Sequence, residues 1–184
     1  MPVIVVEGMD NTGKSTLCDR LFRTGKSVMT RSPGPQSEVA LKNYYHTMVE
    51  LAERTHFAGF NFIFDRMSLV SEEVYGRVLR GDSIFGKDWG KLWDDFIQTL
   101  DPTFVYCRPP RARVLHTLNQ NPQMEGVVLR GEKLLNRYDY FFTITEEIED
   151  LILKGRLYNY NWVDDPDASI LMEELLKGGL LTAW

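Results

Sequence analysis

Gly8-Met9-Asp10-Asn11-Thr12-Gly13-Lys14-Ser15 is the stretch that decides the fold of this chain. It matches the pattern G-x-x-x-x-G-K-[ST], in which successive backbone N–H groups surround the phosphates of a nucleotide. The β-branched run at residues 2–6 indicates a strand that is buried on both faces. Residues 16–22 follow with apolar side chains at helical spacing. Because strand, glycine-rich turn and helix arrive in the required order, the stretch predicts a phosphate-binding loop, or P-loop.

The composition is that of an ordinary globular protein. The chain has 184 residues, of which 43% are hydrophobic and 26% charged, and its formal net charge is -5. This length suits a single domain over residues 1–184. A nucleic-acid partner is not expected, because Lys and Arg form no basic run. No apolar run approaches the ~20 residues of a membrane span. A strand so near the N-terminus leaves no room for a signal peptide, so we expect a cytoplasmic protein.

Strands and helices alternate along the rest of the chain. Apolar runs typical of strands lie at residues 27–30, 60–64, 103–107 and 156–163. Helical patterns lie at residues 37–57, 71–79 and 89–100. Three more follow: one that comes after Pro110 and runs to Leu118, a longer one that ends at about Lys154, and a last one that ends at Lys177. This alternation predicts an α/β, three-layer P-loop NTPase fold with a doubly wound, mainly parallel five-stranded sheet. The polar segment 119–126 has no regular pattern and suggests a mobile loop.

The P-loop residues predict how a nucleoside triphosphate binds. Glycines let backbone amides approach phosphate closely, and the N-terminus of the following helix adds its positive partial charge. We expect Lys14 to reach the β- and γ-phosphates, Ser15 to ligate Mg²⁺, and Thr16 to contact a neighbouring phosphate. The residues expected to bind ATP are Gly8, Asn11, Thr12, Gly13, Lys14, Ser15 and Thr16.

Two charged residues, Asp65 and Arg66, follow the apolar run at 60–64. Ligands of open α/β sheets bind at the carboxyl ends of the strands, so both side chains are expected near the P-loop. A nucleotide-binding switch needs a water-positioning residue, whereas a small-molecule kinase needs a second anion site and a closing loop. An arginine offers a planar fork of donors to an acceptor phosphate. The Asp65-Arg66 pair therefore favours a kinase.

These segments resemble the motifs of thymidylate kinases, in the same order and across nearly the whole chain. Glu7–Asp10 with Gly13–Thr16 is similar to E-G-x-D-x-x-G-K-S-T, and Thr30–Gly34 resembles T-R-E-P-G-G. The family's D-R-Y…S…A-Y-Q-G…R-G block resembles the set Asp65, Arg66, Ser71, Tyr75, Gly76, Arg80 and Gly81. Its strand and P-P-E-x-x-x-x-R turn resemble Thr103–Arg113. Its I-D-A motif resembles Val163-Asp164. Deoxynucleoside kinases share much of this plan, with E-R-S where this chain has Asp65-Arg66-Met67.

The resemblance implies a catalytic group formed by Lys14, Asp10, Asp65 and Arg66. Asp10 would lie near the acceptor's sugar or phosphate and would help to position Arg66. Arg66 would bind the acceptor phosphate and bridge towards the γ-phosphate of the donor. Asp65 would support the Mg²⁺ shell through water.

The resemblance also implies contacts with the rest of the acceptor. Arg31 would join the acceptor's phosphate or sugar site, with Pro33 fixing that loop, and Tyr75 would pack against the sugar. In the family an aromatic residue and an arginine on the second helix hold thymine, at a spacing that the shorter helix 37–57 does not allow. Tyr44 and Tyr45 are the candidates here for stacking on a base, and their alternative role is as core or surface tyrosines.

A lid is expected at about residues 119–130. Kinase lids usually carry an arginine, and residues 119–126 contain none. Arg111, Arg113 and Arg130 flank the segment and are the candidates to close over the phosphates. The alternative for each is a solvated position on a helix.

With the resemblance to thymidylate kinases, these residues lead us to expect an ATP- and Mg²⁺-dependent nucleoside monophosphate kinase for a pyrimidine deoxynucleotide, with dTMP first. One alternative is a deoxynucleoside kinase, in which Asp65 would act as general base on a 5′-hydroxyl. Others are a kinase of a modified pyrimidine, free or within DNA, and a nucleotide-binding switch. By family resemblance we expect a homodimer.

Overall fold

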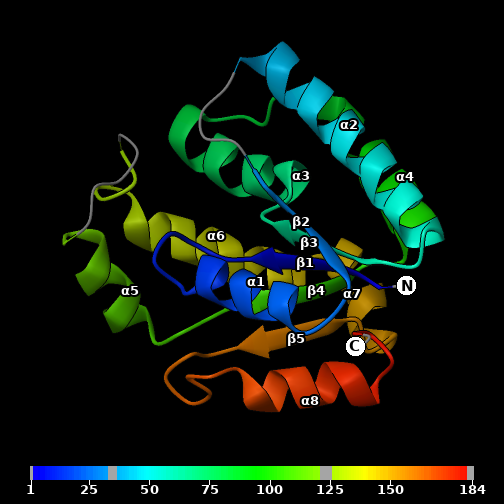
Figure 1. Ribbon diagram of the computed structural model, residues 1–184. Coiled ribbons are helices and arrows are strands. Elements are labelled where there is room, and N and C mark those ends of the chain that lie inside the picture. Colours follow the sequence, from blue (N-terminus) through cyan, green and yellow to red (C-terminus); the bar gives the residue numbers. More distant parts are fainter. Residues whose placement is uncertain (1, 33–36, 121–125, 182–184) are drawn as a thin grey trace.

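The computed structural model describes residues 2–32, 37–120 and 126–181. Its centre is a five-stranded sheet in the order β2-β3-β1-β4-β5 (Figure 1). The strands are β1 (Val3–Glu7), β2 (Ser27–Arg31), β3 (Asn61–Asp65), β4 (Thr103–Cys107) and β5 (Leu157–Tyr160). All four pairings are parallel. The prediction of a doubly wound, five-stranded sheet is thus confirmed.

The central position of β1 follows from its apolar sequence. Every residue of β1, β3 and β4 is buried, as expected for strands covered by helices on both faces. The parallel register pairs Val6 with Asp65 and Glu7 with Tyr106, so the carboxyl ends of the three strands meet at one edge. The chain winds to opposite sides of β1, and this is where α/β sheets bind their ligands.

Two helical layers cover the sheet. α1 (Lys14–Arg23) and α8 (Ser169–Lys177) pack on one face, against the side chains of Ile4 and Val6 (Figure 1). The opposite face carries the larger core, which includes Val3 and Val5. Its helices are α2 (Glu38–Phe57), α3 (Ser68–Ser71), η1 (Glu72–Arg80), α4 (Trp89–Leu100), α5 (Arg111–Leu118), α6 (Gly131–Ile144) and α7 (Glu146–Leu153), with a 3-10 turn η2 (Gly86–Asp88). None of the helices in the described ranges is both long and apolar enough to span a membrane.

Three elements differ from the sequence prediction. The helix predicted at residues 71–79 starts at Ser68, and from Glu72 to Arg80 it has π-helical hydrogen bonding. The helical region expected to run to about Lys154 is two helices, because Thr145 between them has an extended backbone. β5 has four residues, fewer than the run at 156–163 suggested. At the start of α8 the carboxylate of Asp165 accepts from the amides of Ile170 and Leu171.

Candidate active site

The P-loop connects the end of β1 to the start of α1, and its backbone has the shape that phosphate binding needs. Gly8 has a φ of 143°, and a Cβ there would lie 2.7 Å from the carbonyl oxygen of Cys107, so glycine is required. Thr12 Oγ1 donates to the carbonyl of Met9 at 2.8 Å and braces the turn. α1 begins at Lys14, directly after Gly13 with its φ of 89°. The first amides of α1 are therefore available to an anion.

Lys14 is a buried cation at the centre of this loop. Its side chain is 6% exposed, and its Nζ donates to the carbonyl of Met9 at 2.5 Å. Burial and the charge of Arg66 lower the pKa of Lys14 to about 8, against the attraction of Asp10. A buried ammonium that is only partly neutralised by its surroundings favours an incoming polyphosphate.

Ser15, Asp65 and Arg31 meet beside the loop. Ser15 Oγ donates to Asp65 Oδ2 at 2.9 Å, and Arg31 Nε donates to the same oxygen at 2.7 Å. Mg²⁺ prefers hard oxygen ligands, and it usually takes one or two from the protein and the others from water and phosphates. The hydroxyl of Ser15 and the carboxylate of Asp65 fit that requirement. Within the described ranges no three acidic, His or Cys side chains gather as a metal cluster.

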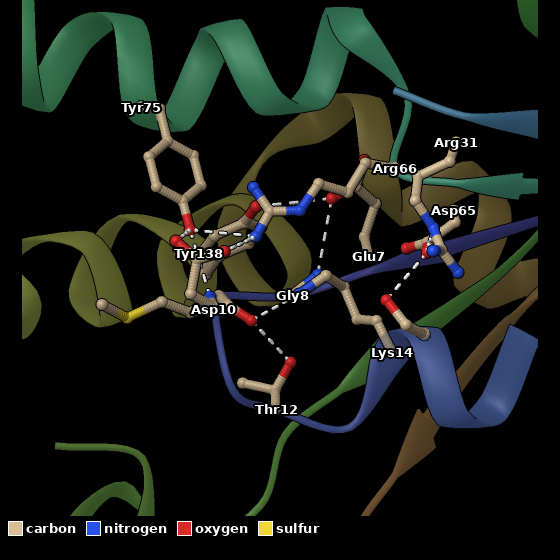
Figure 2. Close-up of polar contacts among 12 residues, drawn as sticks. Glu7, Gly8, Asp10, Thr12, Lys14, Arg31, Asp65, Arg66, Tyr75 and Tyr138 are labelled. Carbon is tan, nitrogen blue, oxygen red and sulfur yellow. Dashed lines mark hydrogen bonds and ion pairs between the residues drawn. The ribbon is translucent and has the colours of Figure 1, made fainter. Parts of the chain in front are cut away.

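Arg66 faces the P-loop from the other side and joins it through Asp10 (Figure 2). Its Nη2 forms an ion pair with Asp10 Oδ1 and donates to the hydroxyl of Tyr75 at 3.2 Å. That hydroxyl donates to Asp10 Oδ2 at 3.0 Å and accepts from the Asp10 amide at 3.1 Å. The Arg66 guanidinium also lies over the Tyr75 ring, 4.9 Å from its centroid. Asp10, Arg66 and Tyr75 therefore form one cluster.

Glu7, the last residue of β1, is a site residue for which the sequence suggested no role. Its side chain is fully buried and accepts from the Met67 amide at 2.6 Å. The Gly8 amide and the Tyr138 hydroxyl approach its other oxygen, each at 3.4 Å. Burial raises the pKa of Glu7 to about 7, although the bonded amides and the charges of Arg66 and Lys14 lower it. The sequence feature that could have pointed to Glu7 is its position as an acidic residue at the end of a buried apolar strand.

The expected acceptor residues do not all lie at this cluster. Arg31 bonds to Asp65, and it lies 3.8 Å from Asp19. Tyr44 is half-buried, with its hydroxyl 2.7 Å from Thr30 Oγ1. Tyr45 packs in the core, where it donates to a carbonyl of α4 and its ring contacts Phe85, so it is not available to stack on a base. Pro33 lies outside the described residues.

Two of the three candidate lid arginines have partners outside the P-loop. Arg111 donates to Asp139 at 3.0 Å and to Asn136 at 2.7 Å, both on α6. Arg130 donates to the carbonyls of Val78 and Leu79 at the end of η1. Arg113 is exposed on α5. The assignment of the lid stays a prediction, and residues 121–125 within it lie outside the described part of the chain.

A tryptophan from the loop after β5, Trp162, lies beside Gly13 of the P-loop. A Cβ added at Gly13 would lie 3.0 Å from Cδ1 of Trp162. The indole nitrogen of Trp162 is buried, and it has no hydrogen-bond partner among the described residues. Trp162 thus neighbours the P-loop at Gly13, whereas Arg66 and Tyr75 contact it at Asp10.

Comparison with known proteins identifies the fold. No protein-family model and no curated protein matches the sequence. Solved structures do match, across nearly the whole chain. YorR from Bacillus subtilis, solved with phosphorylated GDP, aligns with a TM-score of 0.61 and 18% identity over 96% of this chain and 98% of its own.

Two kinases align similarly. Thymidylate kinase from Candida albicans matches with a TM-score of 0.59 and 13% identity, over 97% of this chain and 92% of its own. Deoxyadenosine kinase from M. mycoides, solved with dCMP and dCDP, matches with a TM-score of 0.55 and 14% identity, over 95% of this chain and 98% of its own. The chain therefore has the fold of P-loop nucleotide kinases.

Proposed function

Starting from this nucleotide kinase fold, we propose that the protein transfers the γ-phosphoryl group of ATP to the 5′-phosphate of a pyrimidine deoxynucleotide such as dTMP. The observation that carries the proposal is the ion pair of Arg66 with Asp10, which sets a second cation against the P-loop. A protein that only bound or hydrolysed a nucleoside triphosphate would need no such second anion site.

The donor half of the site consists of the P-loop and the start of α1. Backbone amides and Lys14 would hold the β- and γ-phosphates of ATP. Ser15 and Asp65 would hold Mg²⁺, which supplies positive charge to the phosphate oxygens when it is bound. Ser15 and Thr16 are exposed at the first turn of α1, as ligand contacts require.

The acceptor half consists of Arg66, Asp10 and Tyr75. Arg66 would bind the acceptor's phosphate through the donors not used by Asp10. Tyr75 orients both charged groups, because its hydroxyl contacts each of them. Tyr44 is the remaining tyrosine candidate for a contact with the base, since its ring is not part of the core.

Transfer in this arrangement depends on positioning and charge. An oxygen of the acceptor phosphate forms a bond to the γ-phosphorus, and the bond from that phosphorus to the β-bridging oxygen breaks, releasing ADP. Charge on the transferred group is shared by Lys14 and Arg66, which approach it from opposite halves of the site. When the lid closes, one of its candidate arginines, Arg111, Arg113 or Arg130, would bring a further positive charge to the transferred group.

A nucleoside as acceptor is the second candidate, because deoxyadenosine kinase is among the structures with this fold. A 5′-hydroxyl would need a general base. Asp65 accepts hydrogen bonds from Ser15 and Arg31, and Asp10 pairs with Arg66, so both carboxylates are engaged by other side chains of the protein. Those contacts favour a nucleoside monophosphate over a nucleoside as the acceptor.

A screen with radiolabelled ATP decides between these acceptors. Nucleosides, their 5′-monophosphates with each base and duplex DNA would be supplied separately with Mg²⁺. We expect label in the diphosphate of a pyrimidine deoxynucleotide. Label that appears only in monophosphates made from nucleosides, or in DNA, would contradict the proposal. Mass measurement in solution, with and without substrates, would test the expected homodimer.

A further inference from the structure

Arg66 has an unusual backbone conformation that the surrounding structure must maintain. Its φ is 72°, in the left-handed region that arginine rarely occupies. Such residues persist only where neighbouring contacts hold them, and they concentrate at functional sites. The direction of the guanidinium towards Asp10 depends on this turn.

Two contacts with β1 hold the turn in place. The Arg66 amide donates to the carbonyl of Val6 at 3.1 Å. The next amide, of Met67, donates at 2.6 Å to Oε1 of Glu7. The first contact is backbone to backbone and is independent of side chains. The second depends on one carboxylate, and a charged acceptor makes the stronger kind of hydrogen bond.

The same carboxylate belongs to the strand that enters the P-loop. Its second oxygen is approached by the Gly8 amide and by the Tyr138 hydroxyl from α6 (Figure 2). Glu7 therefore joins the loop that would hold ATP to the turn that would hold the acceptor. Its three partners are all groups of the protein: the Met67 and Gly8 amides and the Tyr138 hydroxyl.

We propose that Glu7 is the positioning residue of the acceptor site, and that its ionised carboxylate keeps Arg66 in the orientation that binds the acceptor phosphate. This inference rests on the proposed function for its kinetic test. Its structural test is independent of that function, because hydrogen exchange at the turn is measured without substrate.

Several titratable groups face Glu7 and bear on how the site responds to pH. Lys14 from α1 and Arg66 from the turn present positive charge to it, and Tyr138 from α6 presents its hydroxyl. Cys107 at the end of β4 is the fourth, and burial raises its pKa to about 12. Of these four groups, Lys14 is the one whose pKa, about 8, lies near neutral pH, and the charge of Glu7 helps to raise it. The KM for ATP, which Lys14 would bind, therefore reports any change at Lys14.

The kinetic test compares the protein with Glu7→Gln at pH 8, using ATP and the deoxynucleoside monophosphate that the screen identifies. Glutamine keeps the shape and an oxygen for the Met67 amide but removes the charge. We expect the KM for the acceptor to rise roughly tenfold and the KM for ATP to stay within about twofold. Glu149→Gln, on the exposed side of α7, makes the same chemical change and should alter neither constant.

The pH dependence separates positioning from a general loss of structure. At pH 6 the wild-type carboxylate is mostly protonated and resembles the amide, so the ratio of the two acceptor KM values should fall towards one. The acceptor's own phosphate also titrates, with a pKa near 6. Its effect cancels in that ratio, because both proteins are measured with the same acceptor at the same pH. A ratio that stays constant between pH 6 and pH 8, or an equal change in both KM values, would overturn the inference.

Hydrogen exchange provides the test that needs no substrate. In Glu7→Gln at pH 8 the amide of Met67 should exchange about tenfold faster than in the wild type. The amide of Leu171, held by Asp165 in α8, should be unchanged. Unchanged exchange at Met67 would refute the role of Glu7 even if no acceptor is phosphorylated, whereas failure of the acceptor screen alone would refute only the proposed function.

Discussion

At the scale of single residues, the site is assembled from charged side chains that the surrounding protein holds in place. Arg66 is oriented by Asp10 and Tyr75, and Lys14 is buried within the P-loop. Under the proposed function, each cation would lie close to where phosphate charge develops, so little reorganisation would be needed during transfer. Substitutions in the two halves should therefore affect different substrates.

Arg66→Ala should weaken the acceptor half alone. Loss of a charged contact to the acceptor phosphate is expected to raise the acceptor KM at least about tenfold, with the KM for ATP nearly unchanged. Arg54→Ala is a matched control, because Arg54 pairs with Glu50 on the exposed face of α2. Steady-state kinetics with each substrate varied in turn measures both constants. An equal rise in the two KM values would place Arg66 outside the acceptor site.

Tyr75→Phe should test whether the hydroxyl orients Asp10 and Arg66. The substitution keeps the buried ring and removes a group that contacts the Asp10 amide, the Asp10 carboxylate and Arg66. We expect kcat/KM for the acceptor to fall about tenfold, equivalent to about 1.4 kcal/mol. Tyr158→Phe on β5 is the control, and activity equal to that control would show that the hydroxyl is dispensable.

At the scale of elements, the π-helix η1 is the part of the fold that departs most from a regular pattern. π-Helical turns are rare and often occur at functional sites. η1 carries Tyr75 towards Asp10, and its buried Glu72 and Glu73 form ion pairs with arginines, including Arg137 of α6. The packing around Gly76 in this helix leaves no space for a side chain.

Gly76→Ala should therefore destabilise the protein. A Cβ at this position would lie 2.9 Å from the carbonyl oxygen of Asp82 and from Glu72 Oε2. Relief of that overlap is expected to cost about 1–3 kcal/mol in the free energy of unfolding. Gly90→Ala in α4 is the matched control, because among the described residues no atom beyond its chain neighbours and its own helix backbone lies within 4 Å of the added Cβ. That control should be neutral or stabilising by up to about 1 kcal/mol, as measured by urea denaturation.

The elements that could be predicted from sequence are those whose periodicity is local. The P-loop, the strand at 103–107 and the helix at 89–100 coincide with the structure, because apolar spacing and end signals determine them. The π-helix could not be predicted, since local apolar spacing does not distinguish π-helical from α-helical hydrogen bonding. In the structure Glu72 pairs with Arg80 inside η1, and Glu73 pairs with Arg137 of α6. Tyr45 had the same local pattern as Tyr44, and only packing against α4 distinguishes the two.

At the scale of the whole molecule, the buried charges of the site oppose folding. Glu7 has a pKa raised from 4.5 to about 7, so the native state holds its proton more tightly than the unfolded state does between those values. Stability from this group is complete below about pH 4.5 and is lost as the pH rises through 7. For Lys14, whose pKa is lowered from 10.5 to about 8, stability is lost as the pH falls from 10.5 towards 8. The two effects together make the site least stable between about pH 7 and 8.

Glu7→Gln should remove the first of these pH dependences. The difference in unfolding free energy between the variant and the wild type should shift in favour of the variant by on the order of 3 kcal/mol from pH 4.5 to pH 8. Thermal or urea unfolding at several pH values measures this difference. A difference that does not change with pH would mean that Glu7 titrates in the native state as it does in the unfolded chain.

The long-range organisation of the site was predictable in outline because strand ends mark it. Asp10 and Arg66 are 56 positions apart, and their meeting follows from parallel pairing of β1 with β3. The role of Glu7 was not predictable, because its partners Met67 and Tyr138 come from two other parts of the chain. The partners of Arg111 and Arg130 likewise depend on the packing of α6 and η1.

The contact of Trp162 with Gly13 gives the molecule an intrinsic optical probe of its own P-loop. Indole emission responds to polarity and to nearby charge, and this ring lies at the loop that a polyphosphate would enter, whereas Trp89 and Trp93 stack in the core. Stepwise addition of ATP should change the emission intensity, and Trp162→Phe should abolish that change. Donor occupancy would thus be readable during mixing, without a label and separately from turnover.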